Sequence, residues 1–295
     1  MKIILVPTDF SDHALYALRV ASNIARKLNA RIWLLHSSYI PSFGIKDIVY
    51  YENFYQNLRE RAESELANLL GQDFLTGIEV EKFLISDRPV WHAIQSGKFS
   101  KPALIVIGSH GRSGFNRLMV GSNAEKIVRL AKAPVLTIKK NYLNFNINKI
   151  IFASDFSDEV SRVVPAIKFF ARIYRAQLLL LKVITPSEFE STPVSYKLMS
   201  DFKKEHNFTR CSVNIYNHNS IIEGILDFSQ ETHADMIIIP THGRTGFAHL
   251  INGSLAESLA FREPKPVLSI KFPVKEVPPI ETPPEASIYH NLEFF

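Results

Sequence analysis

The 295-residue chain contains a single cysteine, Cys211. One thiol excludes intrachain disulfides and cysteine-based zinc sites. The alternating polar and apolar residues around it predict a strand in which the thiol is a small packed side chain. No apolar run approaches the roughly 18 residues that a membrane-spanning helix needs, and residues 3–6 are too short a run for a signal-peptide core. These absences predict a cytoplasmic protein that does not contact membranes.

Several motifs of nucleotide and metal chemistry are also missing. The chain has no G-x4-G-K-(S/T) loop, no G-x-G-x2-G fingerprint and no H-E-x2-H pair. Its 34 Lys and Arg against 29 Asp and Glu give a net charge of +5, scattered in pairs such as Lys139-Lys140. No aromatic residues interleave with a basic stripe, so nucleic acid is not predicted as a partner. The sequence predicts no metal site, no catalytic residues and a protein that is not an enzyme.

The chain is a duplication. Residues 6–12 (VPTDFSD) match 152–158 (FASDFSD), and residues 133–139 (APVLTIK) match 265–271 (KPVLSIK). The shared order spans nearly all of each half. We therefore predict a first domain over 1–140, a second over 147–272, and an extended proline-rich tail over 273–295.

Strand and helix patterns alternate within each copy. In the first, a helix capped by Ser11 follows the strand at 3–6. Such alternation predicts an α/β fold in which each half is a doubly wound, five-stranded parallel sheet. The other ranges expected are strands at 31–36, 78–85, 103–107 and 134–138, helices at 53–70, 89–99 and 122–131, and, in the second copy, a helix near 195–206 and a strand near 209–216.

A glycine signature occurs once in each half. Residues 108–122 read G-x2-G-x9-G-S, whereas residues 240–254 repeat the pattern with Pro240 in the first glycine position. Each copy follows an apolar run and precedes a helical pattern. A strand end, a glycine loop and a helix N-terminus together favour anion binding, because backbone N–H groups and the helix dipole face the same ligand.

Both halves resemble the universal stress protein family, and the whole chain resembles a tandem member. The resemblance rests on residues 7–11, the glycine signature and residues 133–136, and it covers roughly 2–139 and 149–271. It implies a fold similar to that of adenine nucleotide alpha hydrolases. It also implies ATP as ligand, with or without Mg²⁺, and a stress-response role.

The resemblance further implies which residues bind nucleotide. Asp9 would hydrogen-bond the nucleoside, the backbone at Pro7 and Ser37 would line the adenine, and the glycine loop would run along ribose and phosphates. The full set expected at the two sites is Pro7, Thr8, Asp9, Ser37, Gly108, Ser109, His110, Gly111, Arg112, Ser113, Gly114, Gly121, Ser122, Asn123, Asp155, Val183, Gly243, Gly253 and Ser254.

Plainer interpretations stay open for several of these residues. The glycines could only turn the chain into the next helix, and Asp9 could cap that helix. His110 and His242 have no fixed partner and are interpreted as loop residues. Pro240 lacks an N–H and would crowd a nucleotide, so we expect about one ATP per chain. A nucleotide-free scaffold and a slow ATP hydrolase are the alternative functions.

The family pairs its domains through the last strand, here 134–138 and 266–270. Covering both exposed edges within one chain would leave neither free to pair with another molecule. We expect an intrachain pseudo-dimer with these strands antiparallel, and a homodimer is a further alternative.

Overall fold

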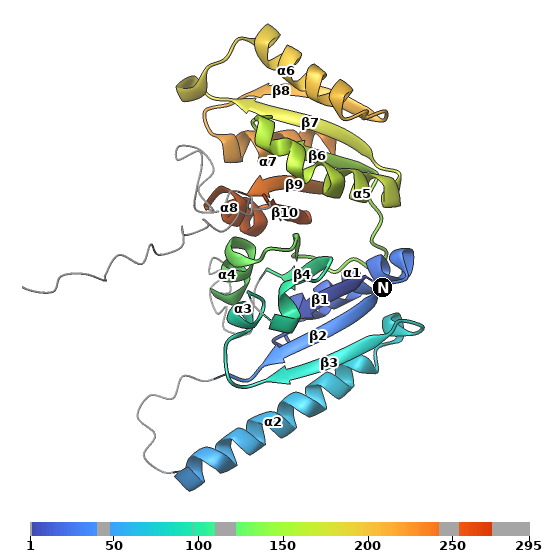
Figure 1. Ribbon diagram of the computed structural model, residues 1–295, viewed down its shortest axis with the longest axis vertical. Coiled ribbons are helices and arrows are strands. Elements are labelled where there is room, and N and C mark those ends of the chain that lie inside the picture. Colours follow the sequence, from blue (N-terminus) through green and yellow to red (C-terminus); the bar gives the residue numbers. More distant parts are fainter. Residues whose placement is uncertain (1, 40–47, 96, 110–121, 242–253, 273–295) are drawn as a thin grey trace, which may run out of the picture.

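The computed structural model describes residues 2–39, 48–95, 97–109, 122–241 and 254–272. These residues form one ten-stranded sheet with the order β3-β2-β1-β4-β5-β10-β9-β6-β7-β8. The strands stack along the long axis of the molecule, from β3 at one end to β8 at the other (Figure 1). The tail predicted for 273–295 lies outside the described residues.

The first half supplies one side of this sheet. Strand β1 pairs in parallel with β2 and β4, β2 with β3, and β4 with β5. Its elements are β1 (Ile3–Pro7), α1 (Asp12–Leu28), β2 (Arg31–Ser37), α2 (Ile48–Leu70), η1 (Asp73–Leu75), β3 (Val80–Ile85), α3 (Val90–Ala93), η2 (Gly97–Ser100), β4 (Leu104–Gly108), α4 (Ser122–Leu130) and β5 (Val135–Ile138).

The second half repeats the same order. Strand β6 pairs in parallel with β7 and β9, β7 with β8, and β9 with β10. Its elements are β6 (Lys149–Ala153), η3 (Asp158–Val163), α5 (Val164–Tyr174), β7 (Gln177–Ile184), η4 (Pro186–Glu188), α6 (Thr192–Glu205), β8 (Cys211–Asn217), α7 (Ile221–Thr232), β9 (Met236–Thr241), α8 (Ser254–Arg262) and β10 (Val267–Lys271). The α/β class and the parallel, doubly wound halves predicted from the sequence are confirmed.

The halves meet along their last strands. Strand β10 pairs antiparallel with β5, with Leu268 opposite Leu136 and Val267 opposite Thr137. Both hydrophobic cores continue across this junction, because Leu136 and Leu268 lie in one and Val135 and Val267 in the other. Each of these last strands therefore has a hydrogen-bonded neighbour on both sides within the chain.

Period-two alternation along the strands separates the two cores. In β1, Ile4 and Val6 pack with α1 on one face, and Leu5 packs on the other face with the α3–α4 side. Helices α1, α2, α5 and α6 contribute to the first core, and α3, α4, α7 and α8 to the second. Strands buried on both faces explain the unbroken apolar runs seen in the sequence.

The helix predicted over 89–99 is wrong in length. Helix α3 ends at Ala93, and after residue 96, which lies outside the described residues, the chain forms the 3-10 turn η2. Gly97, at the start of that turn, has φ +64°, a left-handed conformation that an α-helix does not contain. The sequence shows a glycine there but not its conformation.

The first helix of each half differs in its opening turns. Helix α1 is α-helical from Asp12, whereas the matching residues of the second half, Asp158–Val163, are wound as the 3-10 helix η3 before α5 begins. Pro165 lies in the first turn of α5, where its missing N–H costs little. If a single α-helix ran from Asp158 to Tyr174, Pro165 would lie in its interior, where proline is unfavourable. The α-helix therefore begins at Val164, directly before Pro165.

Helices α4 and α8 pack against each other across the junction. They bring together two equivalent carboxyl groups, Glu125 and Glu257. Burial and the neighbouring Glu125 raise the pKa of Glu257, and Arg129 opposes the effect. Among the described residues the Oε1 atom of Glu257 has no hydrogen-bond partner. The charged form of Glu257 is therefore disfavoured in the folded chain.

A raised folded-state pKa means that the stability this carboxyl contributes is present at low pH and is lost as pH rises through that value. We expect Glu257→Gln to raise the Tm at neutral pH, with the gain shrinking as the pH falls through the raised folded-state pKa and lost below about pH 4.5, where the carboxyl is protonated in both states. Thermal unfolding as a function of pH measures this. The exposed Glu65→Gln on α2 is the control. An equal gain at every pH, or a loss at neutral pH, would contradict the account.

Candidate functional site

The predicted binding residues gather at the carboxyl ends of adjacent strands. In the first half, β1, β2 and β4 end at Pro7, Ser37 and Gly108, and β1 is hydrogen-bonded to both of the other strands. Parallel strands direct these ends to one edge of the sheet, where ligands of doubly wound folds bind. In the second half, β6, β7 and β9 end at the corresponding edge.

Asp9 holds a tight turn immediately after β1. Its Oδ1 accepts hydrogen bonds from the backbone N–H (3.1 Å) and the hydroxyl (2.6 Å) of Ser11. The Thr8 hydroxyl accepts from the N–H of Phe10 (3.1 Å), whose φ is +63°. Ser11 then caps α1 by accepting from the N–H of Ala14 (3.2 Å), as predicted. The carboxylate therefore fixes where the helix begins.

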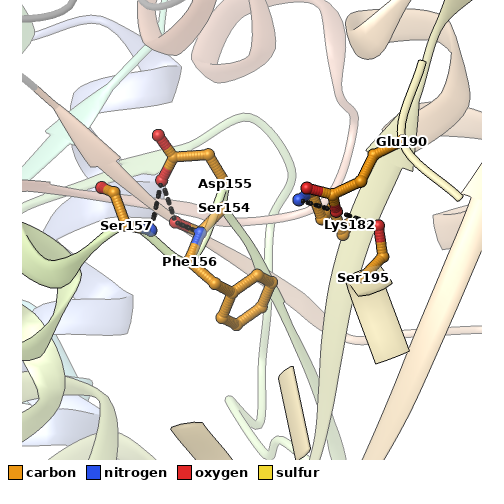
Figure 2. Close-up of polar contacts among 7 residues, drawn as sticks. All are labelled: Ser154, Asp155, Phe156, Ser157, Lys182, Glu190 and Ser195. Carbon is orange, nitrogen blue, oxygen red and sulfur yellow. Dashed lines mark hydrogen bonds and ion pairs between the residues drawn. The ribbon is translucent and has the colours of Figure 1, made fainter. Parts of the chain in front are cut away.

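The second half repeats this turn (Figure 2). Asp155 Oδ1 accepts from the N–H of Ser157 (3.1 Å), and the Ser154 hydroxyl accepts from the N–H of Phe156 (3.2 Å). Phe156 has φ +60°. A non-glycine residue in this region is uncommon, and here it occurs at the same place twice. The two halves thus present the same carboxylate in the same turn.

The two halves differ near the end of their second strand, where the first half has His36. His36 lies in β2, with Nδ1 2.8 Å from the carbonyl oxygen of Thr8 and its ring 4.3 Å from that of Phe10. A carbonyl only accepts, so Nδ1 carries the proton. His36 thus links the end of β2 to the Asp9 turn.

Lys182 occupies the His36 position in the second half. Its Nζ lies 2.6 Å from Glu190 Oε2, an atom that also accepts a hydrogen bond from the Ser195 hydroxyl (Figure 2). These two donors lower the pKa of Glu190. Lys182 is 15% exposed and Ser195 is buried. The ion pair connects the segment before α6 to the end of β7. Because Glu190 carries the opposite charge, it neutralises the charge of Lys182.

Sequence reasoning missed Lys182, Glu190 and Ser195. In the duplicated sequence, Leu35-His36-Ser37 corresponds to Leu181-Lys182-Val183. This correspondence sets a lysine opposite a histidine, and it was the available signal. Glu190 lies in a connection without periodicity, and nothing in the sequence identifies it as the partner of Lys182.

Ser37, which was predicted to line adenine, and Val183, the expected site residue at the matching position of the second half, have different surroundings. Ser37 donates from its hydroxyl to the carbonyl oxygen of Arg88 (2.8 Å). Val183 packs against α7 at Gly224, where an added Cβ would lie 2.7 Å from Val183 Cγ1 and 2.9 Å from His218 Cβ. The first half keeps a polar group at this position, and the second fills it with an apolar one.

Gly224→Ala is expected to lower the stability by about 1 kcal/mol, because crowding costs about 1–3 kcal/mol and the helix propensity of alanine returns part of it. Adding Val183→Ala should recover part of the loss, since the nearest contact is a side chain. Urea unfolding of the two single variants and the double variant gives the coupling between the sites. Strictly additive effects would show that the two residues do not crowd each other.

Gly108 has a packing role that its motif does not reveal. A Cβ at this position would lie 2.5 Å from the carbonyl carbon and 2.6 Å from the carbonyl oxygen of His13, in the first turn of α1. From the sequence, Gly108 was expected either to let the backbone approach a phosphate or to turn the chain into the next helix. The structure adds that its missing side chain lets α1 lie on the end of β4.

Pro240 occupies the corresponding place at the end of β9. It is buried, and β9 passes through it to Thr241 with β10 as its neighbour. The segment that would lie over it is the 3-10 helix η3 rather than the first turns of an α-helix. The second half thus differs from the first in two ways at this edge of the sheet: it has a proline in place of the glycine, and its first helix begins as a 3-10 helix.

The remaining predicted residues follow the strand ends. Ser109 is buried, and its N–H donates to the carbonyl oxygen of Ile138 (3.0 Å). Helices α4 and α8 begin at Ser122 and Ser254, with Asn123 exposed in the first turn of α4. The loop residues lie outside the described residues: His110, Gly111, Arg112, Ser113, Gly114, Gly121, His242, Gly243 and Gly253.

The described part of the chain contains no cluster of three or more His, Cys, Asp or Glu side chains that could hold a metal ion. Within the same residues, no helix combines the length and apolar character needed to cross a bilayer.

A family model describes this arrangement. The model of the universal stress protein family matches the chain twice, over residues 1–139 and 146–271. The chain belongs to the universal stress protein family. Because the model matches each half separately, the protein is a tandem, two-domain member.

Known universal stress proteins resemble about half of the chain or nearly all of it. The protein MJ0531 of Methanocaldococcus jannaschii is 29% identical over 140 residues, which cover 47% of this chain and 82% of that protein. A Thermus aquaticus protein is 33% identical over 47% of this chain and 98% of its own length. The crystal structure of an Archaeoglobus fulgidus member superposes with a TM-score of 0.72 at 23% identity, covering 92% of this chain and 98% of the other. This last likeness shows the fold of both halves together.

Proposed function

We propose that this tandem universal stress protein binds ATP or a related adenine nucleotide, mainly in its first half, and acts as a cytoplasmic stress-response regulator rather than an enzyme. The observation that carries the proposal is the difference between two otherwise repeated edges. The first has Gly108, His36 and an α-helix that begins at Asp12. The second has Pro240 and η3 at the matching places.

The first edge fits an adenine nucleotide chemically. The Asp9 turn offers a carboxylate at the end of β1, and helix α4 begins directly after the glycine loop. A helix N-terminus favours phosphate through its N–H groups and dipole. At the second edge, Val183 replaces the Ser37 hydroxyl and Glu190 already neutralises Lys182. That edge offers a nucleotide fewer free polar groups.

The pairing of β5 with β10 supports an internal pseudo-dimer, in which the two domains of one chain take the place of two subunits. The regulatory mechanism we propose is binding-coupled: nucleotide occupancy changes a surface that a partner protein contacts. Gel filtration with light scattering, with and without ATP, tests whether the chain also forms a homodimer.

The Asp9 and Asp155 turns provide a matched test. We expect Asp9→Ala to weaken ATP binding by about 10- to 150-fold, the equivalent of one lost hydrogen bond to a charged group. Asp155→Ala should leave the affinity unchanged. Both variants lose the same turn, so a stability cost common to the two does not explain a difference in binding. Calorimetric titration, with and without Mg²⁺, gives affinity and stoichiometry.

Equal losses in the two variants would contradict the assignment to the first half. An absence of binding by wild type, together with no nucleotide released from the purified and denatured protein, would favour the nucleotide-free scaffold. Phosphate release above the level of Asp9→Ala would favour the slow hydrolase.

A further inference from the structure

A basic trough lies at the edge of the second half opposite to the Asp155 turn. It consists of two adjoining cavities, of about 660 and 750 Å³, at the amino ends of β7 and β8. Phe208, Asn207 and Thr209, between α6 and β8, line both cavities. The trough therefore runs from the end of α5 to the end of α6.

All the charged residues that line the trough are positively charged. None of the residues described as lining either cavity is acidic, and no ion pair joins a lining cation to a carboxylate in the described part of the chain. The cations are Lys168, Arg172, Arg175, Lys203, Lys204 and Arg210. Lys168, Arg172 and Arg175 are exposed, so their charges are available to a ligand.

Helix ends account for only part of this charge. Arg172, Lys203 and Lys204 lie in the last turns of α5 and α6, where cations are stabilised by the helix dipole. Arg210 donates from Nη1 to the carbonyl oxygen of Arg175 (2.8 Å). Arg175 is the C-cap residue of α5, whereas Lys168 lies earlier in that helix. The charge of Lys168 therefore adds to the trough without such stabilisation.

The walls of the trough are fixed by the ends of the two helices. Arg175 and Asn207 adopt left-handed conformations, with φ of +51° and +50°. Backbone hydrogen bonds close both ends, from Ala176 to Ala171 (2.9 Å) and from Phe208 to Lys203 (3.1 Å). These are the closures of a helix C-terminus, so the cations project from a preorganised surface.

Two of the three aromatic rings described in the lining of the trough, those of Phe169 and Phe208, are already covered by cations, which leaves Tyr196 as the single open ring there. Lys168 lies 5.5 Å from the centre of the Phe208 ring, and Lys2 lies 4.1 Å from that of Phe169. Single-stranded nucleic acids bind largely by stacking bases on open aromatic faces. Covered rings beside several cations instead favour a small anion with several charges.

We propose that the basic trough binds a small anion of linked phosphate groups, of the tripolyphosphate kind. Linked phosphates can contact both cavities at once, with guanidinium forks matching their oxygens. This site lies at the opposite edge of the sheet from the nucleotide site and does not depend on it.

Calorimetric titration of the full chain with sodium tripolyphosphate tests the proposal. We expect binding that weakens as NaCl is raised. It should weaken at least about tenfold in the double variant Lys168→Gln, Arg172→Gln, whose exposed positions leave the fold intact. The control is Arg61→Gln, Lys101→Gln, two exposed cations outside the trough, which should bind as wild type does. Asp9→Ala should also keep tripolyphosphate binding at the trough.

Two further probes distinguish linked phosphate groups from other anions. The trough should bind orthophosphate more weakly than tripolyphosphate. It should bind an oligothymidylate of ten nucleotides no more tightly than tripolyphosphate. Equal binding by the two double variants would overturn the proposal. So would orthophosphate binding as tight as that of tripolyphosphate, or tighter binding of the oligonucleotide that Lys168→Gln, Arg172→Gln abolishes.

Discussion

Gly108→Ala is expected to destabilise the first half by about 3 kcal/mol, the upper part of the range for overpacking. The added methyl group would lie 2.5–2.6 Å from backbone atoms of His13. A flexible side chain could turn away from such a contact, but a helix backbone cannot, so α1 would have to shift on the sheet. Urea unfolding monitored by circular dichroism measures the loss.

A second glycine provides the control for this variant. A Cβ on Gly71 would lie 3.6 Å from its nearest neighbour, an ordinary contact, so Gly71→Ala should be close to neutral. If Gly108→Ala proves as stable as Gly71→Ala, the close approach of α1 to β4 is not what requires the glycine.

This contact changes how the glycine signature is interpreted. From the sequence alone, replacing Gly108 is a test of phosphate binding. In the structure the same residue positions α1, whose first turn is fixed by Asp9 and Ser11. A loss of ATP binding in Gly108→Ala would therefore combine a misplaced helix with any lost phosphate contact. Asp9 and Asp155, compared as a pair, separate these effects.

The sequence was sufficient where the information is local or repeated. The Ser11 cap, the strand ends at Pro7 and Gly108 and the α/β order all follow from periodicity and duplication. It was insufficient where distant residues meet. The contact of Gly108 with His13 and the ion pair of Lys182 with Glu190 depend on packing that no spacing encodes.

A second large effect is expected in the second half, where two prolines, Pro165 and Pro240, influence how its first helix begins. Pro240 stands where the first half needs a glycine, and Pro165 stands where α1 has Arg19 in its interior. Pro165 cannot donate to the carbonyl oxygen four residues earlier, and its ring clashes with that group. An α-helix running through from Asp158 is excluded by Pro165 whatever occupies position 240.

We therefore expect Pro240→Gly alone to leave ATP binding in the second half weak. The double variant Pro165→Ala, Pro240→Gly should allow an α-helical start at Asp158 and strengthen that site by about tenfold or more, the equivalent of at least one charge-assisted hydrogen bond. Titration in an Asp9→Ala background isolates the second site, and circular dichroism reports the added helix. If Pro240→Gly alone creates a tight second site, Pro240 is the sole obstacle and Pro165 only shapes the helix. If the double variant gains helix but no affinity, the obstacle lies elsewhere at this edge, where Glu190 holds Lys182.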